Sequence, residues 1–252
     1  MRIFKIYFFI VCAAALFPAA LSAQKKEQKP AEKTAPKNVA VVSNQPSGGA
    51  SQKSETAPNF SSVAQSVLEE INAARNDPQS YVKYLEDYKK LFKGDTVFLP
   101  DFTQVQTNEG TAGVDEAIEF LKTAPKLAPY KISDGLNQTS GTQLQDMMEN
   151  SALGHKGKDG GDLATRLNRV GRFVGDYGEN ITHAAEIPRQ IVMMMIIDDG
   201  VKSRGHRKNI FSPDYKVVGI SFGKGKIGEG LCVVDFASGF YENDSKSGVR
   251  EF

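Results

Sequence analysis

The sequence predicts an α+β domain in which helices cover a sheet, and three observations carry this prediction. Apolar residues recur at helical spacing in several segments from residue 61 onward. A glycine-rich region interrupts these helices, and two alternating apolar runs near the C-terminus are typical of a β-hairpin. The 252-residue chain has a formal net charge of +1, so bulk electrostatics do not favour a nucleic-acid partner, and none is expected.

Residues 1–23 are predicted to be a signal peptide. Arg2 and Lys5 supply a basic start, an uncharged apolar run follows, and Leu21-Ser22-Ala23 offers a small-residue cleavage site. The run is too short to span a bilayer comfortably, so an uncleaved anchor is the weaker alternative, and no transmembrane segment is expected after cleavage. The protein is therefore predicted to be secreted or otherwise extracytoplasmic, in the periplasm, at the cell surface or outside the cell.

Residues 24–60 are predicted to be a disordered low-complexity linker. Residues 24–58 contain no aromatic side chain, and such a stretch cannot bury enough apolar surface to offset its chain entropy. The folded domain is expected over residues 61–241, with a short tail at residues 242–252.

The chain has two cysteines, Cys12 and Cys232. Cys12 lies in the predicted signal peptide, so the exported protein is expected to have no internal disulfide, although export would permit one. Cys232 lies in the apolar run Leu231-Cys232-Val233-Val234, where a buried, inert thiol is expected rather than a reactive nucleophile.

The predicted elements follow from capping residues, breakers and spacing. Ser61-Ser62 caps a first helix, Asn76-Asp77-Pro78 ends it, and a second helix carries Tyr81 to Leu85. Residues 93–113 are expected to form a long connection. Further helices are expected over residues 117–122, over residues 136–150, between the cap Asp162 and the stop Gly171, and from Pro188 to the stop Gly200.

The last of these helices and the hairpin are expected to form the most buried part of the domain. Every position from Ile191 to Ile197 is apolar, so this helix should be buried nearly all round. The hairpin is expected to run from Val217 to Phe222, turn through Gly223–Gly230 and return from Leu231 to Phe236.

Three short motifs do not carry the chemistry that they resemble. Gly223–Gly228 matches the dinucleotide fingerprint, but a strand follows it where the fingerprint needs a helix. Ser221 lies in a G-x-S-x-G string, but in an alternating strand and not in a nucleophile elbow. Gly157–Asp162 lacks the Gly-Lys-Ser/Thr of a phosphate loop.

Three histidines, His155, His183 and His206, are the most informative residues. Imidazole and carboxylate groups together can bind a divalent metal or transfer protons, and Glu179 lies between His155 and His206 in the sequence. The spacing of the histidines matches no local metal motif. His183 is expected at the surface, with a role as an accessory ligand left open.

Asp198 and Asp199 end the buried helix, where the helix dipole is already negative. Acids at this end need a cation to offset them. A neighbouring basic residue such as Arg204, a metal ion or a protonated His206 would each serve, and the sequence leaves these alternatives open.

Two motifs together give the chain its resemblance to a known family. Gly178-Glu179-Asn180-Ile181, followed by Gly205-His206-Arg207-Lys208-Asn209-Ile210, resembles the signature pair of the bacterial branch of the CAP superfamily. This superfamily groups cysteine-rich secretory proteins, antigen-five proteins and pathogenesis-related proteins. The early helix with Ile71–Arg75, the His155 loop and the segment Val217–Ile220 extend the resemblance over most of residues 61–240.

The resemblance implies a three-layer α-β-α sandwich with a mainly antiparallel central sheet. It also implies a cleft with two histidines and two acidic residues, and His155, Glu179 and His206 match three of these places. Arg204 stands where the commonest bacterial pattern has the second acid. Aligning the preceding helix instead gives this place to Asp199, with Asp198 as the open alternative.

The resemblance leaves three functions open. The first is a secreted binding module whose cleft holds Zn²⁺ or another divalent cation at His155, Glu179, Asp199 and His206, with a lipid, a cell-wall fragment or a protein as extracellular ligand. The second is a metal-dependent hydrolase in which the histidines hold zinc and Glu179 is the general base. The third is a purely structural His–carboxylate tetrad. The binding module is favoured because no nucleophile or oxyanion device is recognisable.

Overall fold

The computed structural model describes residues 62–100, 103–150, 154–184, 186–224 and 230–243. The predicted signal peptide (1–23), the predicted linker (24–60) and nearly all of the predicted tail (242–252) lie outside the described residues. The helices are α1 (Ser62–Asn76), α2 (Pro78–Lys89), α3 (Thr111–Thr123), α4 (Asp134–Asn150), α5 (Leu163–Val170), α6 (Pro188–Ile197) and α7 (Gly205–Ile210). The strands are β1 (Phe92–Lys93), β2 (Thr96–Phe98), β3 (Gln104–Gln106), β4 (Lys131–Ile132), β5 (Gly171–Ala184), β6 (Val217–Lys224) and β7 (Gly230–Glu242).

The main sheet has the strand order β4-β6-β7-β5. β6 and β7 form the predicted hairpin, β5 pairs antiparallel with β7, and the short β4 pairs parallel with β6. The β5–β7 ladder runs from Gly171↔Glu242 to Ala184↔Gly230, with one irregularity between Val174 and Tyr177. The sheet is therefore mainly antiparallel, as expected, and β5 is its long edge strand.

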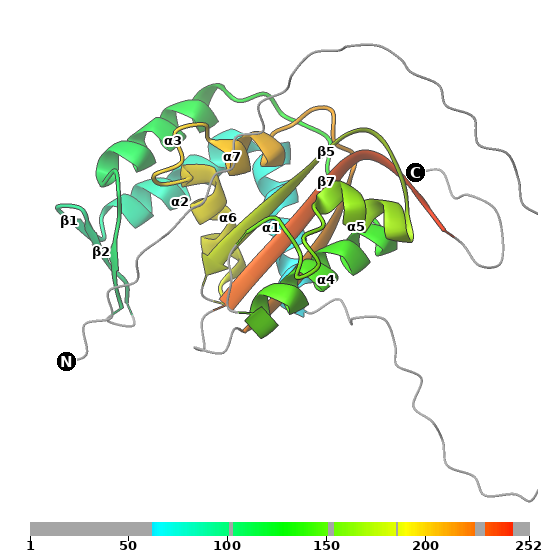
Figure 1. The fold of residues 1–252 in the computed structure, drawn as a ribbon. Coiled ribbons are helices and arrows are strands. Elements are labelled where there is room, and N and C mark those ends of the chain that lie inside the picture. Colours follow the sequence, from blue (N-terminus) through cyan, green and yellow to red (C-terminus); the bar gives the residue numbers. More distant parts are fainter. Residues whose placement is uncertain (1–61, 101–102, 151–153, 185, 225–229, 244–252) are drawn as a thin grey trace, which may run out of the picture. The chain divides into compact units, whose positions relative to one another are not determined.

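Alternation along β7 shows that helices cover both faces of this sheet. Cys232, Val234 and Phe236 belong to the core formed with α1, α2, α3 and α6. Leu231, Val233 and Ala237 pack with residues of α4 and α5 instead. Because successive side chains of a strand point to opposite faces, the sheet is the middle of three layers. Figure 1 shows α4 and α5 on one side of β7 and α1 on the other, so the chain has the expected α-β-α sandwich.

One glycine explains how closely α4 approaches the sheet. A Cβ atom on Gly219 of β6 would lie 1.9 Å from the backbone carbon of Leu136 and 2.2 Å from the backbone nitrogen of Asn137. Only glycine permits this contact between helix and strand. It also brings Ser140 of α4 over β6, where its hydroxyl lies 2.9 Å from that of Ser221.

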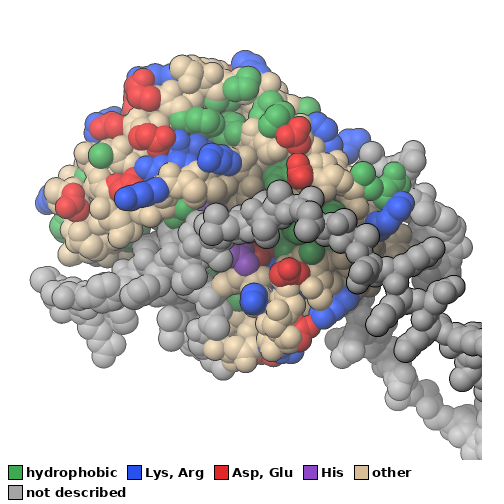
Figure 2. All heavy atoms as spheres, turned by 45° about the horizontal axis from the view of Figure 1, so that its top comes forward, with side chains coloured by type: hydrophobic (Ala, Val, Ile, Leu, Met, Phe, Trp, Pro, Cys, Tyr) green, Lys and Arg blue, Asp and Glu red, His purple; other side chains and the backbone are tan. Residues whose placement is uncertain are grey.

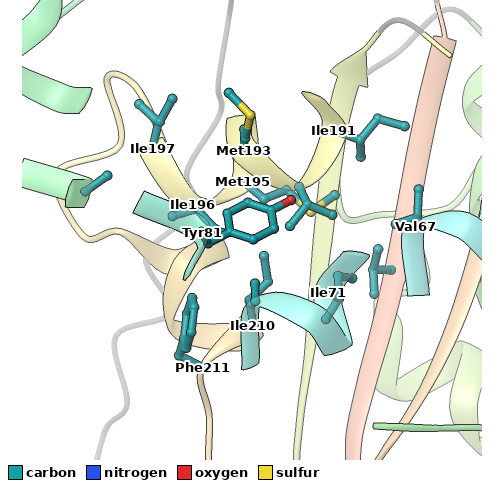
Figure 3. Packing of buried hydrophobic residues seen from close by; sticks show 14 of the residues in the cluster. Val67, Ile71, Tyr81, Ile191, Met193, Met195, Ile196, Ile197, Ile210 and Phe211 are labelled. Carbon is teal, nitrogen blue, oxygen red and sulfur yellow. The ribbon is translucent and has the colours of Figure 1, made fainter. Parts of the chain in front are cut away.

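The core of the larger layer forms around α6, whose prediction as a buried helix is confirmed. Its apolar side chains interdigitate with Val67 and Ile71 of α1 and with Tyr81 of α2 (Figure 3). Burying one such aliphatic side chain contributes about 1.5–3 kcal/mol to folding. Met194 is the exception within the run from Ile191 to Ile197, because it is only partly buried.

Two boundaries differ from the prediction. The expected connection at residues 93–113 contains part of a small antiparallel sheet, β1-β2-β3, in which Val97 pairs with Val105 and is fully buried. Short polar strands such as Gln104–Gln106 give little period-two signal, so their pairing was not recognisable. The helix expected over residues 117–122 begins earlier, at Thr111, after Gly110 with its positive φ of 58°.

The caps of α5 are confirmed, and the expected stop of α6 is wrong. Asp162 accepts a hydrogen bond from the Thr165 amide at 2.9 Å, and Gly171 follows the last turn of α5. α6 does not continue to Gly200. It stops at Ile197, because Asp198 adopts the left-handed conformation with φ 55° and ψ 47°. Asp is among the few non-glycine residues that tolerate this conformation.

Candidate functional site

His155 is held by a buried carboxylate that is itself held by an arginine. His155 lies in the loop after α4, and its Nδ1 is 2.8 Å from Oε1 of Glu179 on β5. The other carboxylate oxygen, Oε2, accepts a hydrogen bond from Arg166 of α5. Arg166 also donates to the His155 carbonyl at 3.2 Å. Since a carboxylate accepts at Nδ1, the His155 ring presents Nε2 to its surroundings.

Burial differs along this chain of contacts. The side chains of Arg166 and Glu179 are only 2% and 3% exposed, whereas the His155 side chain is 42% exposed. The ion pair therefore lies beneath the imidazole. Both oxygens of Glu179 are engaged, so in this structure Glu179 orients His155, and the expected role of Glu179 as a metal ligand stays a prediction.

A second carboxyl group lies beside Glu179 without facing solvent. Asp235 of β7 is the cross-strand neighbour of Glu179 and is fully buried. Burial, followed by the nearby negative charge of Glu179, raises the pKa of Asp235 well above its ordinary value. Its Oδ2 lies 2.5 Å from the hydroxyl of Thr139 on α4.

His206 is held in the same manner from the other helical layer. Its Nδ1 is 2.7 Å from Oδ1 of Asp198, and its backbone amide donates to Oδ2 of Asp198 at 2.9 Å. The left-handed backbone of Asp198 turns the carboxylate back toward the first residues of α7. The Asp198 side chain is fully buried and His206 is 15% exposed, so here too the carboxylate fixes Nδ1.

Asp199 does not pair with His206, contrary to the expected alignment. It accepts hydrogen bonds from the backbone amides of Asn108 and Glu109, at 2.7 and 2.9 Å, and from the Asn108 side chain. The turn at Asp198 sends consecutive side chains in different directions, so Asp198 meets α7 while Asp199 anchors the loop before α3. The acidic partner of His206 is therefore Asp198.

Asparagines join the two signature motifs. Asn180 donates to the carbonyl of His206 at 3.0 Å, and Asn209 donates to Oδ1 of Asn180 at 2.8 Å. A Cβ atom on Gly178 would lie about 3 Å from side-chain atoms of both Asn209 and Tyr215, so a larger residue here would require these side chains to shift. Each motif thus fixes the backbone of the other.

Both imidazoles reach one pocket at the edge of the sheet. It has a volume of about 90 Å³, and its lining includes His155, His183, His206, Asp198 and Asp199. Glu179 is absent from its lining. On the face shown in Figure 2, a histidine side chain is exposed with acidic side chains beside it. Within the described residues, no group of three or more His, Cys, Asp or Glu side chains is arranged to hold a metal ion.

The sequence alone did not reveal Arg166. It lies in the helix run Leu163–Val170 and has the ordinary appearance of a surface arginine, although it is only 3% exposed. The one available signal was its helical phase, because Leu163, Arg166 and Leu167 share the buried face of α5.

Two of the short motifs that the sequence analysis set aside lie at least partly within the described residues, and neither shows the chemistry that it resembles. Ser221 lies within β6 and contacts Ser140 and the Asn137 carbonyl, with no histidine among its hydrogen-bond partners. Of the string Gly223–Gly228, only Gly223 and Lys224 are described, at the end of β6. Among the described helices, none is long and apolar enough to cross a membrane.

The paired motifs and the sandwich fold agree with a family match. The family model described as the cysteine-rich secretory protein family, CAP, matches residues 68–236, more than half of the chain. The chain belongs to this family. The CAP match spans both motifs and all of the pocket-lining elements, from α2 through α7.

Individual relatives of this CAP chain are distant. It is 26% identical over 96 residues to the uncharacterized protein YkwD of Bacillus subtilis (strain 168), covering 38% of this chain and 35% of that protein. An extracellular protein containing a SCP domain from Bacillus anthracis str. Ames is 22% identical with a TM-score of 0.36, covering 48% of this chain and 37% of that one. An outer surface protein of Borrelia burgdorferi is 17% identical with a TM-score of 0.39, covering 50% and 88%. The chain thus spans a little over a third of the two Bacillus proteins.

Proposed function

We propose that this protein is an extracellular CAP-domain binding module that takes a divalent cation between His155 and His206, together with an extracellular ligand. The observation that carries the proposal is that both imidazoles reach one pocket while a buried carboxylate holds the Nδ1 of each. Metal-binding histidines characteristically donate their second ring N–H to such a carboxylate. The signal peptide predicted at residues 1–23 supports the extracellular location.

The donor set does not fit a closed structural site, and it has one protein ligand fewer than the usual open zinc site, so the bound ligand or solvent would have to complete the coordination. Nε2 of His155 and Nε2 of His206 are the two available donors, and zinc in a structural site takes four protein ligands. A bound cation would supply Lewis acidity and open coordination positions for an oxygen of the ligand. The protein groups hold the rings in place: Glu179 and Arg166 on one side, Asp198 on the other.

Hydrolysis with Glu179 as general base has less support. A general base needs hydrogen-bond reach to the reacting water, but Glu179 does not line the pocket and both of its oxygens are engaged. The structural-tetrad alternative has the same His–carboxylate pairs as our proposal. The two differ only in that the structural tetrad binds no cation.

Calorimetric titration of the purified protein with zinc near neutral pH tests the proposal. We expect micromolar or tighter binding that is lost in the His155→Ala/His206→Ala double variant. Asp214→Ala, at an exposed position outside the pocket, is the control and is expected to leave binding intact. Absence of zinc binding in the wild-type protein would refute the cation site and favour the structural tetrad.

A further inference from the structure

The pocket that both histidines reach carries negative charge. Asp198 and Asp199 line it, whereas no lysine or arginine of the described residues does. Arg204 lies in the same connection between α6 and α7, but its guanidinium pairs with Glu109 at 2.6 Å and with Glu116 at 3.1 Å. Since like charges repel at short range, the pocket disfavours an anion and favours a cation.

The polar groups of the pocket accept hydrogen bonds. Nδ1 of His155 and Nδ1 of His206 each face a carboxylate, so in the neutral ring Nδ1 carries the proton and Nε2 presents a lone pair. Asp199 accepts three hydrogen bonds from Asn108 and Glu109, and an ionised carboxylate has about four lone-pair sites. A group that donates hydrogen bonds fits this set, whereas a carboxylate ligand, which only accepts, does not.

The size of the pocket limits what can enter. Its volume of about 90 Å³ corresponds to about three water molecules at about 30 Å³ each. A group of about three non-hydrogen atoms therefore fits, such as an ammonium nitrogen with two methylene carbons. The remainder of a larger ligand would have to lie outside.

An apolar wall lies close to the charge of Asp199. The rings of Tyr88 and Phe92, which line the pocket, meet edge to face with centroids 5.5 Å apart. Burial, followed by the negative charge of Asp199, raises the pKa of Tyr88 well above its ordinary value, so the carboxylate acts on the hydroxyl end of this ring. Aromatic side chains beside an acid suit the methylene carbons and the positive end of an alkylammonium group.

We propose that this pocket also takes the tip of a primary alkylammonium group, with its N–H donors shared among Asp199, His206 and solvent. The group would occupy the pocket in place of the divalent cation proposed above, so the inference goes beyond the proposed function and does not depend on metal binding. An ammonium group does not need three converging protein ligands, an arrangement that the described residues lack. A lysine side chain and a peptide N-terminus share this chemistry.

Nuclear magnetic resonance titrations of the purified protein, in the presence of a metal chelator, test the proposal. We expect ethylammonium to shift the imidazole resonances of His206, with about millimolar affinity at best for a ligand of so few atoms. Propionate, an anion of similar size, and tetraethylammonium, a cation too large for the pocket, should leave these resonances unchanged. Glycinamide and Nα-acetyl-lysinamide represent the two sources, and tighter binding of one of them would identify it.

Two variants test the place of binding. Asp199→Asn keeps the shape of the side chain and removes its charge, and it is expected to weaken ethylammonium binding at least about fivefold. Asp214→Asn, at an exposed position outside the pocket, removes the same charge and is the matched control. Val105→Phe fills the pocket from a partly exposed wall position and should abolish binding without altering Asp199. Unchanged affinity in both pocket variants would overturn the proposal, as would binding of propionate or tetraethylammonium by the wild type.

Zinc titration in excess ethylammonium separates this inference from the proposed function, with tetraethylammonium at the same concentration as the control for ionic strength. Because the two ligands share His206, ethylammonium should lower the apparent zinc affinity. Zinc binding that ethylammonium does not weaken, or zinc binding without any ethylammonium binding, would overturn the ammonium site and keep the cation site. Ethylammonium binding without zinc binding would do the reverse.

Discussion

At the scale of single residues, Asp235 is a buried carboxyl group whose surroundings disfavour its charged form. The Thr139 hydroxyl lies 2.5 Å from Oδ2 of Asp235 and 3.0 Å from the carbonyl of Leu136, and a hydroxyl has one proton to donate. Thr139 shares this proton between the two acceptors, and burial beside the negative charge of Glu179 is what favours the neutral form of Asp235. This agrees with the direction of its pKa, which burial and Glu179 raise.

Asp235→Asn is therefore expected to be tolerated and to change the pH dependence of stability. A group whose pKa is raised in the folded state stabilises the fold fully below its unfolded value, and this contribution is lost as pH rises. In the wild type, the contribution of Asp235 to the free energy of unfolding should decrease from about pH 4 upward, until the pH passes the raised pKa. Asp235→Asn should remove this pH-dependent contribution. Thermal unfolding across pH measures it, with exposed Asp214→Asn as control. A loss above about 2 kcal/mol in Asp235→Asn at neutral pH would mean that Asp235 is ionised in the fold.

Arg166→Met is expected to destabilise the domain strongly. Removing one partner of a buried ion pair leaves an uncompensated charge, here on Glu179, and typically costs about 3–5 kcal/mol. Arg169→Met on the same helix breaks only the exposed pair with Asp159 and should change stability little. Denaturant unfolding compares the two. Adding Glu179→Gln to Arg166→Met should recover part of the loss, and no recovery would contradict the charge argument.

At the scale of elements, the backbone of the turn between α6 and α7 determines the hydrogen-bond partners of Asp198 and Asp199. Asp198 caps α6 and holds α7 through His206, whereas Asp199 holds the loop that precedes α3. Arg207 strengthens the same junction by donating to the carbonyl of Ile196 at the end of α6. One turn therefore connects two segments that line the pocket, the α6–α7 junction and the loop before α3.

Replacing Asp198 or Asp199 by alanine is expected to have different effects on zinc affinity. Asp198→Ala should lower zinc affinity about 10–100-fold, the usual effect of losing a group that orients a metal-binding histidine. Asp199→Ala should keep zinc affinity and instead speed hydrogen exchange at the amides of Asn108 and Glu109. Calorimetry and amide exchange on both variants measure these effects. Equal losses of zinc affinity would contradict the division of roles.

The sequence predicted these elements unevenly, for physical reasons. Buried helices such as α6 and the β6–β7 hairpin have strong apolar periodicity, so their existence was predictable. The pairing of β5 with β7 was not predictable. The residues of β5 alternate only weakly between polar and apolar, and β7 lies about 50 residues later in the sequence, near the C-terminus. The choice of Asp198 depends on one left-handed φ angle of 55°, which neighbouring sequence does not determine.

At the scale of the whole molecule, the site exists because β5 is an edge strand with a helical layer on each face. Glu179 and Asn180 are consecutive, so their side chains point to opposite faces. Glu179 meets Arg166 and His155 on the α4–α5 side, and Asn180 meets His206 on the α6–α7 side. The family resemblance predicted that the two histidines meet, but only the layered fold explains how residues from opposite faces line one pocket.

The same layering predicts that Cys232 reports on opening of the entire sandwich. Cys232 lies on the central strand β7, is fully buried, and burial raises its pKa to about 12, so thiolate is scarce in the folded protein. In a Cys12→Ser background, we expect its reaction with a disulfide reagent to be slow in native buffer and to accelerate with urea along the global unfolding curve. Ser238→Cys, on the same strand but partly exposed, should react readily when placed in a chain lacking both natural cysteines. Equal native rates at the two positions would mean that β7 becomes accessible without global unfolding, and that the layers on its two faces do not open as one unit.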